Sequence, residues 1–262
     1  MTPGRSFSYY SYWPRQYALG LVRLWQFNGP VVALRLTLFN LLRIRRIFRI
    51  RLYGFTIDVR SGSPDLAVAI DSLGFEFEPL AATPDPGGLI IDAGGYIGTA
   101  ALKFAALFPR SRIVTVEPSP ENLELLRRNV HGIANIVVME AALAATAGEA
   151  TLRDAGTGEW GFSIAAEGRA MATVPTATIE QILAHENTDR LFLLKLDVEG
   201  AEREILAVSG RWMARTEAVI AELHEDLAPG AGAAYAAATI GRVNRNLPGE
   251  KVMSLQAGTA SA

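Results

Sequence analysis

Short apolar runs alternate with helical segments from Leu89 onward, and this alternation constrains the fold more than any other feature. The pattern predicts strands at 89–91, 113–116, 136–139, 192–196 and 218–223, and helices at 98–107 and 120–130. Ser119 before Pro120 is typical of a helix start, and Thr178 with Gln181 predicts a capping box for a further short helix. Strands and helices in this order indicate an α/β fold with a Rossmann-like, mostly parallel central sheet flanked by helices.

Composition limits the chemistry that the chain can perform. Half of its 262 residues are apolar, which is enough for the core of one large domain with an appended segment. The chain has no cysteine, which excludes disulfides, thiolate-held zinc or iron–sulfur clusters, and cysteine nucleophiles. Nothing therefore favours an oxidising compartment, and the expected location is cytoplasmic, with peripheral attachment to the inner membrane surface as an alternative.

Charge divides the chain near residue 53. Nine arginines and no acidic residue precede Asp58, whereas the other 205 residues carry 16 basic and 27 acidic groups. After a break at Gly29-Pro30, one side of a helical wheel collects the arginines, namely Arg35, Arg43, Arg45, Arg46 and Arg49. Residues 1–53 are therefore expected to form a basic amphipathic helical segment. Such a segment either contacts an anionic membrane surface or covers its own domain.

The sequence of residues 1–53 does not favour membrane spanning, export or nucleic-acid binding. Its arginines interrupt every apolar run before the length of a transmembrane helix is reached, and no signal-peptide pattern is present. No recognition motif accompanies the charge, so a nucleic-acid partner is not expected.

Residues 51–60 alternate as a strand entering the main domain, which is expected at 54–226. The last residues, 227–262, are either the C-terminal part of that domain or a poorly ordered tail.

A glycine-rich turn follows the first expected strand. Gly94, Gly95 and Gly98 allow a tight turn at a helix start, but their spacing is not that of a dinucleotide-binding motif. Asp92, just before them, would repel a pyrophosphate and suits a positively charged ligand such as S-adenosylmethionine. Glu117 ends the next strand, where an acidic residue can accept hydrogen bonds from ribose hydroxyls. Glu140, at the end of the third strand, is a further candidate for contact with the adenine.

A second group of polar residues follows the fourth and fifth strands. Asp197 is our first choice for contact with the reacting centre, through the methionyl end of the cofactor or the acceptor hydroxyl, and Glu199 is the next. Lys195 either pairs with an acidic residue or binds substrate. His224 is a candidate base at the sheet edge. The spacing does not establish a metal, although a divalent cation held by Asp197, Glu222 and His224 is conceivable.

Three segments together resemble a known family. Residues 89–98 and 113–122, and above all the string KLDVEGAE at 195–202, are similar to FkbM-type S-adenosylmethionine-dependent methyltransferases. Residues 57–66 resemble that family's entry segment, and 220–224 its closing strand, so the resemblance covers roughly residues 54–226. It implies a class I methyltransferase fold and methyl transfer to oxygen, often a hydroxyl of a sugar or secondary metabolite. Tyr96 stands where the family commonly has Asn, at the turn that would hold the cofactor's amino-acid end.

Two other functions compete with this interpretation. A dinucleotide-dependent oxidoreductase is disfavoured by Asp92 and by the lack of a third correctly spaced glycine. A membrane-peripheral binding or scaffold protein with a non-catalytic methyltransferase fold is favoured by Tyr96 and the basic first segment. The acidic cluster at 197–202 argues against it, because a scaffold has no physical need for such a cluster in a cleft. The leading hypothesis is an O-methyltransferase acting on a small-molecule or glycan acceptor.

Overall fold

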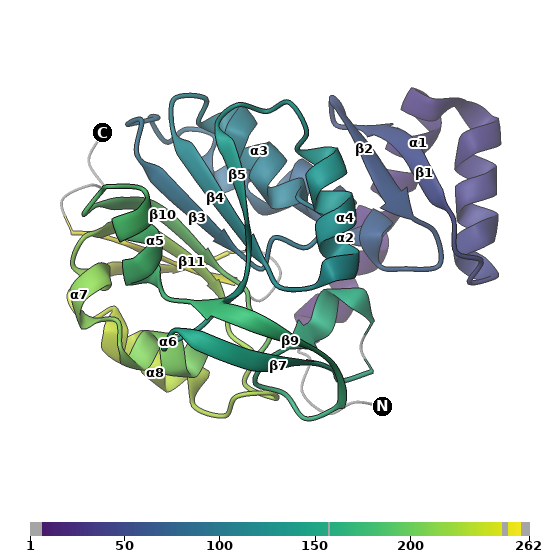
Figure 1. Cartoon of the computed structure of the whole chain (residues 1–262). Helices are drawn as coiled ribbons and strands as arrows, with labels where there is room; N and C mark the ends of the chain where they lie inside the picture. Colours follow the sequence, from purple (N-terminus) through teal and green to yellow (C-terminus); the bar gives the residue numbers. More distant parts are fainter. Residues whose placement is uncertain (1–6, 157, 248–250, 258–262) are drawn as a thin grey trace.

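The computed structural model describes residues 7–156, 158–247 and 251–257, with side chains from residue 18 onward. Its centre is a seven-stranded sheet in the order β12-β13-β11-β10-β3-β4-β5 (Figure 1). The strands are β3 (Leu89–Ala93), β4 (Arg112–Glu117), β5 (Ile136–Glu140), β10 (Leu191–Leu196), β11 (Thr216–Glu222), β12 (Val243–Asn246) and β13 (Lys251–Leu255). β3, β4, β5, β10 and β11 are parallel, and β13 is antiparallel to β11 and β12. The expected α/β fold with a mostly parallel sheet is confirmed.

Helices cover both faces of this sheet because its central strands are apolar on both sides. Ile90 belongs to the core on one face and Ile91 to the core on the other. The helices on the Ile90 face are α1 (Phe7–Leu41), α2 (Asp65–Asp71), α3 (Thr99–Leu107) and α4 (Pro120–Asn129). Those on the Ile91 face are α5 (Ile179–His185), α6 (Glu202–Ala207), α7 (Gly210–Met213) and α8 (Ala231–Ala238).

Local sequence signals account for the helix starts. The Ser119 hydroxyl accepts a hydrogen bond from the backbone N–H of Asn122, with Pro120 in the first turn of α4. Thr178 and Gln181 form the expected capping box at the start of α5. α4 therefore begins directly after β4, and α5 directly after the strand that ends at residue 177.

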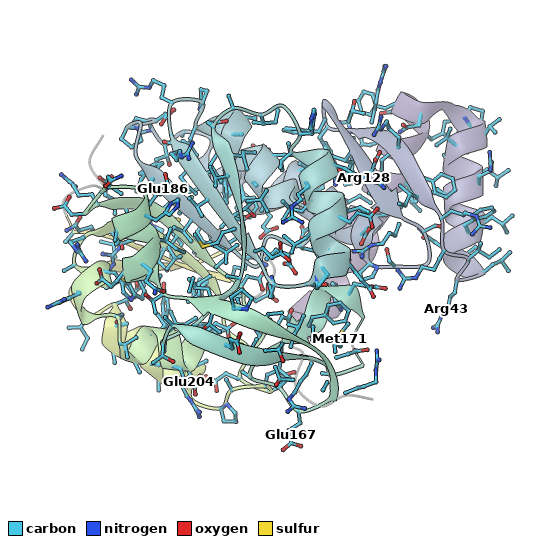
Figure 2. All side chains as sticks on the ribbon, in the orientation of Figure 1. Arg43, Arg128, Glu167, Met171, Glu186 and Glu204 are labelled. Atoms are coloured by element: carbon cyan, nitrogen blue, oxygen red, sulfur yellow. The ribbon has the colours of Figure 1, made fainter. Side chains whose placement is uncertain are left out.

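The N-terminal segment differs from the expected basic helix. α1 is kinked at Gly29, as expected, but it ends at Leu41, so the wheel that placed arginines up to Arg49 on one helix is wrong. β1 (Ile47–Leu52) and β2 (Phe55–Arg60) follow as an antiparallel hairpin, where a single strand was expected at 51–60. The boundary expected near residue 53 falls in the turn of this hairpin. Figure 2 shows Arg43 pointing away from the body beyond the end of α1.

Two further regions have more regular structure than their sequences indicate. A four-stranded sheet is formed by β6 (Ala142–Leu143), β7 (Gly148–Asp154), β8 (Phe162–Ser163) and β9 (Arg169–Ala177). A bulge between Leu152 and Arg153 breaks its alternation, which hides β7 from a period-two pattern. The described part of 227–262 contributes α8, β12 and β13, so it belongs to the domain.

Candidate functional site

A cavity of about 660 Å³ opens at the carboxyl ends of the parallel strands. It lies where the strand order reverses between β3 and β10, which is the usual ligand crevice of open α/β sheets. Its walls come from the turns after β3, β4, β10 and β11, and from α2 with the π-helical turn Ser72–Glu76 that follows it. β13 and Trp160 complete the lining. The expected residues that line it are Gly94, Gly95, Tyr96, Glu117, Lys195, Asp197, Glu199 and His224.

The glycine turn brings two strand ends into contact. Gly94 has φ +81°, and a Cβ there would lie 1.9 Å from the carbonyl oxygen of Asp197. The backbone N–H groups of Gly94 and Gly95 donate to the carbonyl oxygen of Val116 at 3.1 and 2.9 Å. Glycine at position 94 therefore lets the turns after β3 and β10 approach each other across the crevice. Gly98 begins α3 with φ +86° and does not line the cavity.

Glu117 places a buried carboxylate on the cavity wall. Its oxygens accept hydrogen bonds from the backbone N–H groups of Tyr96 at 2.8 Å and Ser119 at 2.9 Å, and from the Asn122 amide at 3.2 Å. Burial raises the pKa of Glu117 to about 7, although these donors act against that rise. The group is fixed at the end of β4, where the sequence predicted a ribose contact.

Tyr96 is built into the fold by its side chain. Its hydroxyl donates to Asp65 at 2.5 Å, and the guanidinium of Arg60 lies 5.5 Å from the ring centre. Arg60 in turn forms two hydrogen bonds of 2.9 Å with Asp65. The residue that departs from the family pattern thus joins α2 and β2 to the glycine turn after β3, and its backbone N–H donates to Glu117.

Asp92 has a different place from the one expected. It is fully buried outside the cavity lining, where it accepts from the Thr115 hydroxyl at 2.9 Å and lies 3.4 Å from the Lys195 ammonium. Lys195 also lies 3.4 Å from Asp197 and donates to the carbonyl oxygen of Gly94 at 3.0 Å. Asp92 therefore positions Lys195, and Lys195 connects the two strand ends that frame the crevice.

These charges stabilise one another electrostatically. Burial favours the neutral form of Lys195, but Asp197 and Asp92 outweigh it and raise the pKa of the ammonium above its ordinary range. Burial also acts against ionisation of Asp197, yet Lys195, Lys251 and His224 lower the pKa of that carboxyl to about 2. Asp197 is thus an anion at neutral pH, and it cannot serve as a proton donor there.

Glu202 holds the loop that follows β10. Its carboxylate accepts from the backbone N–H groups of Val198 at 3.0 Å and Gly200 at 2.9 Å, and it lies 2.9 Å from Nδ1 of His224. The side chain is fully buried and is absent from the cavity wall. Glu202 is therefore a positioning residue, which favours the structural role over direct contact with ligand.

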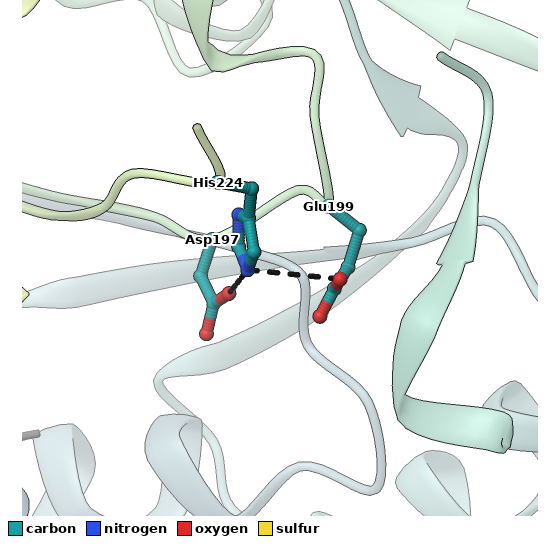
Figure 3. A group of neighbouring side chains, drawn as sticks. All are labelled: Asp197, Glu199 and His224. Carbon is teal, nitrogen blue, oxygen red and sulfur yellow. Dashed lines mark ion pairs between the residues drawn. The ribbon is translucent and has the colours of Figure 1, made fainter. Parts of the chain in front are cut away.

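His224 faces three carboxylates with its other ring nitrogen. Nε2 lies 3.6 Å from Glu199, 3.8 Å from Glu222 and 3.9 Å from Asp197. Figure 3 shows the imidazole between Asp197 and Glu199. Burial would lower the pKa of His224, but the Glu202 hydrogen bond and the neighbouring charges raise it to about 10. The imidazole is therefore protonated at neutral pH in this arrangement.

Glu199 combines a cavity position with an intermediate pKa. Burial is the main cause that raises its pKa to about 7, and His224 opposes this rise. Its backbone is in the left-handed region at φ +53°, and its carbonyl oxygen accepts from the Ser163 hydroxyl at 2.5 Å. The second sheet therefore helps to fix the conformation that points this carboxyl at the cavity.

Asp197, Glu199 and His224 have ligand atoms within 4.8 Å of one another, close enough to share a cation. The Glu202 contact turns Nε2 of His224 toward the carboxylates, as a second carboxylate does in many metal sites. The sequence had suggested Glu222 in place of Glu199 in this group, and the divalent metal itself stays a prediction. Equilibrium dialysis against Mg²⁺ or Mn²⁺, with Asp197→Asn as the control, would test it.

Sequence reasoning missed an ion pair at the far side of the cavity. Lys251 at the start of β13 pairs with Glu222 and lies 3.4 Å from Glu76, which follows α2. Burial raises the pKa of Glu76 to about 7, although Lys251 opposes this. The tail lacked periodicity, so nothing in the sequence pointed to Lys251.

Glu140 was expected near the adenine, but it pairs with Arg127 at 2.7 Å and does not line the cavity.

Comparison with known proteins identifies the class of this site. The methyltransferase FkbM domain model matches residues 92–232, more than half of the chain. This match assigns the protein to the methyltransferase class. The chain belongs to the FkbM methyltransferase family, as the sequence motifs indicated. A comparison with proteins of curated function finds no match.

Several solved structures resemble the chain at low sequence identity. A precorrin-6y C5,15-methyltransferase from Geobacter metallireducens is 14% identical over 64% of this chain and 80% of its own, with a TM-score of 0.38. An rRNA methylase from Streptococcus thermophilus is 13% identical over 68% and 91%, with a TM-score of 0.41. A Methanococcus jannaschii fibrillarin pre-rRNA processing protein is 13% identical over 80% and 81%, with a TM-score of 0.40.

Proposed function

We propose that this protein is an S-adenosylmethionine-dependent O-methyltransferase whose acceptor is a hydroxyl of a sugar, a glycan or another natural product. One observation carries the proposal. A single cavity is lined by Glu117 at the end of β4 and by Asp197, Glu199 and His224 at the ends of β10 and β11. It therefore has an acidic group suited to ribose on one side, and on the other a candidate base, Glu199, beside two charged groups that can orient an acceptor.

The residues present fit this cofactor. Glu117 offers carboxylate oxygens for two ribose hydroxyls, and Asp197, which stays ionised, suits the positive charge of the methionyl end. The cavity volume of about 660 Å³ lies within the range of small-molecule sites. When bound, the cofactor supplies a methyl group on a positively charged sulfur, which leaves as a neutral sulfide.

Glu199 is the group that we assign as the general base. Its carboxyl reaches the cavity and has a pKa of about 7, so it is available to take the hydroxyl proton as oxygen attacks the methyl carbon. Asp197 and protonated His224 would orient the acceptor through hydrogen bonds. The protein's contribution is then alignment of the acceptor oxygen with the methyl group and removal of one proton.

Calorimetric titration tests the cofactor assignment. S-adenosylmethionine should bind the wild-type chain, and Glu117→Gln should weaken binding by about tenfold or more because a charged hydrogen-bond acceptor is lost. Glu121→Gln, an exposed carboxyl at the start of α4, is the matched control and should bind as the wild type does. Equal affinity of the folded Glu117→Gln and wild-type proteins would contradict the ribose assignment.

Acceptor methylation tests the reaction. Wild-type protein with labelled cofactor is incubated with a panel of glycans and hydroxylated metabolites, and the product is examined by NMR for a methyl ether. Glu199→Gln should reduce kcat by about 10²-fold or more with cofactor affinity unchanged. Asp226→Asn, at the exposed edge of the cavity, is the control. Methylation of nitrogen or carbon only would overturn the proposed O-methylation.

A further inference from the structure

The C-terminal half of α1 carries an apolar stripe on its solvent side. Val31, Leu34, Leu38 and Leu41 recur at helical spacing, and their exposed fractions are 67, 69, 46 and 77%. The opposite side is buried, with Leu36 fully enclosed. We call these four exposed residues the outer face of α1. A stripe of this kind is more than the scattered exposed apolar residue that surfaces normally contain.

Further exposed apolar side chains precede and follow this stripe in the sequence. Before the kink, Trp25 is 61% exposed and Val22 53% exposed, and directly after the helix Leu42 is 59% exposed. Trp25 is an amphipathic aromatic of the kind that lies at membrane–water interfaces. The helix therefore buries one side against α2 and β1 and leaves the other side apolar and not covered by the residues that the structure describes.

Positive charge is concentrated on α1 and on the segment that follows it. The exposed arginines on and beside α1 that have no carboxylate partner among the described residues are Arg23, Arg35, Arg43, Arg46 and Arg51. No acidic residue precedes Asp58 in the sequence to compensate for them. Apolar side chains flanked by unpaired arginines match a surface that is apolar inside and anionic at its boundary.

We propose that the outer face of α1 docks on an anionic lipid bilayer. The four apolar side chains would enter the headgroup–acyl boundary, and the flanking arginines would bind lipid phosphates. A second copy of this chain fits the face less well, because two copies meeting there would bring like-charged arginines together. No helix in the described part of the chain has the length and apolarity needed to cross a membrane, so the contact is peripheral.

Vesicle co-sedimentation of the full chain tests this docking. We expect binding to vesicles of equal phosphatidylcholine and phosphatidylglycerol, and much weaker binding to phosphatidylcholine alone. The triple substitution Val31→Gln, Leu34→Gln and Leu38→Gln should lower the partition coefficient by about tenfold or more. Glutamine preserves the helix propensity of these exposed positions. Val208→Gln with Ile240→Gln, at 55 and 82% exposed positions elsewhere, is the matched control.

Charge is tested separately with Arg35→Gln, Arg43→Gln and Arg46→Gln, which should also reduce binding to the anionic vesicles by about tenfold or more. Wild-type chain that stays in solution with both vesicle types would overturn the proposal. So would a wild-type dimer that the triple apolar substitution turns into a monomer while neither binds vesicles. Neither measurement depends on methyl transfer, so this inference and the proposed function stand or fall independently.

Discussion

Replacing Glu202 by Gln removes the charge that holds the site loop and His224. The carboxylate accepts from the backbone N–H groups of Val198 and Gly200 and faces Nδ1 of His224, all at 2.9 to 3.0 Å. One carboxylate oxygen serves both Val198 and His224, and the other serves Gly200. Gln has one oxygen, so its amide N–H₂ must face either the Gly200 N–H, or the Val198 N–H and the imidazolium together. Removing one partner of a buried charge pair typically costs about 3–5 kcal/mol, and we expect the free energy of unfolding to fall by that amount at pH 7.

The pH dependence of this loss has a definite sign. The pKa of His224 is raised to about 10 in the folded protein, above its ordinary value of 6.5. Its pairing therefore stabilises the fold fully below pH 6.5 and is lost as pH rises through about 10. The difference between wild type and Glu202→Gln should accordingly shrink toward pH 10. About 1–3 kcal/mol should remain for the unsatisfied backbone N–H.

Urea unfolding followed by circular dichroism measures both quantities, and NMR titration of the His224 ring should show its pKa falling in the variant. Glu204→Gln is the control, since that carboxyl lies on the same helix (Figure 2), is about half exposed and pairs with the exposed Arg203. It should cost less than about 1 kcal/mol. A loss below about 1 kcal/mol for Glu202→Gln, or one that does not change with pH, would refute the reasoning.

Three further outcomes are expected. Gly94→Ala should lower the free energy of unfolding by about 3 kcal/mol, because its Cβ would clash with the Asp197 carbonyl. The control is Gly132→Ala, which has the same φ of +81° but no atom near the added Cβ, and it should cost about 1 kcal/mol. If thermal or urea unfolding shows equal losses, the close approach is not what requires glycine. Lys251→Met should cost about 3 kcal/mol or more above pH 7, because it removes the cation that pairs with Glu222 and Glu76. The cost should be smaller under acidic conditions, where Glu76, whose pKa is raised to about 7, becomes protonated, and a loss independent of pH would contradict this. The wild-type kcat/KM should rise through about pH 7 as Glu199 loses its proton, and a flat profile would exclude Glu199 as the base.

Local sequence signals predicted much of the sheet and part of the site. Apolar strand runs, the Ser119 cap and the Thr178 capping box depend on neighbours within a few residues, so they can be read without the fold. The parallel sheet then places residues from the ends of different strands at one edge. For this reason Glu117 and Asp197 were correctly expected to lie around one crevice.

The tertiary structure decided what each of these residues touches. Asp92 turned out to position Lys195 from outside the cavity, and Glu140 pairs with Arg127 instead of facing the site. Lys251 reaches the cavity because β13 pairs with β11. This pairing brings Lys251 to Glu222, which is 29 residues away in the sequence. Strand-end positions follow from short-range patterns in the sequence. Partners and burial depend on long-range packing, and it is packing that sets the pKa of Glu199 and His224 and so divides their roles.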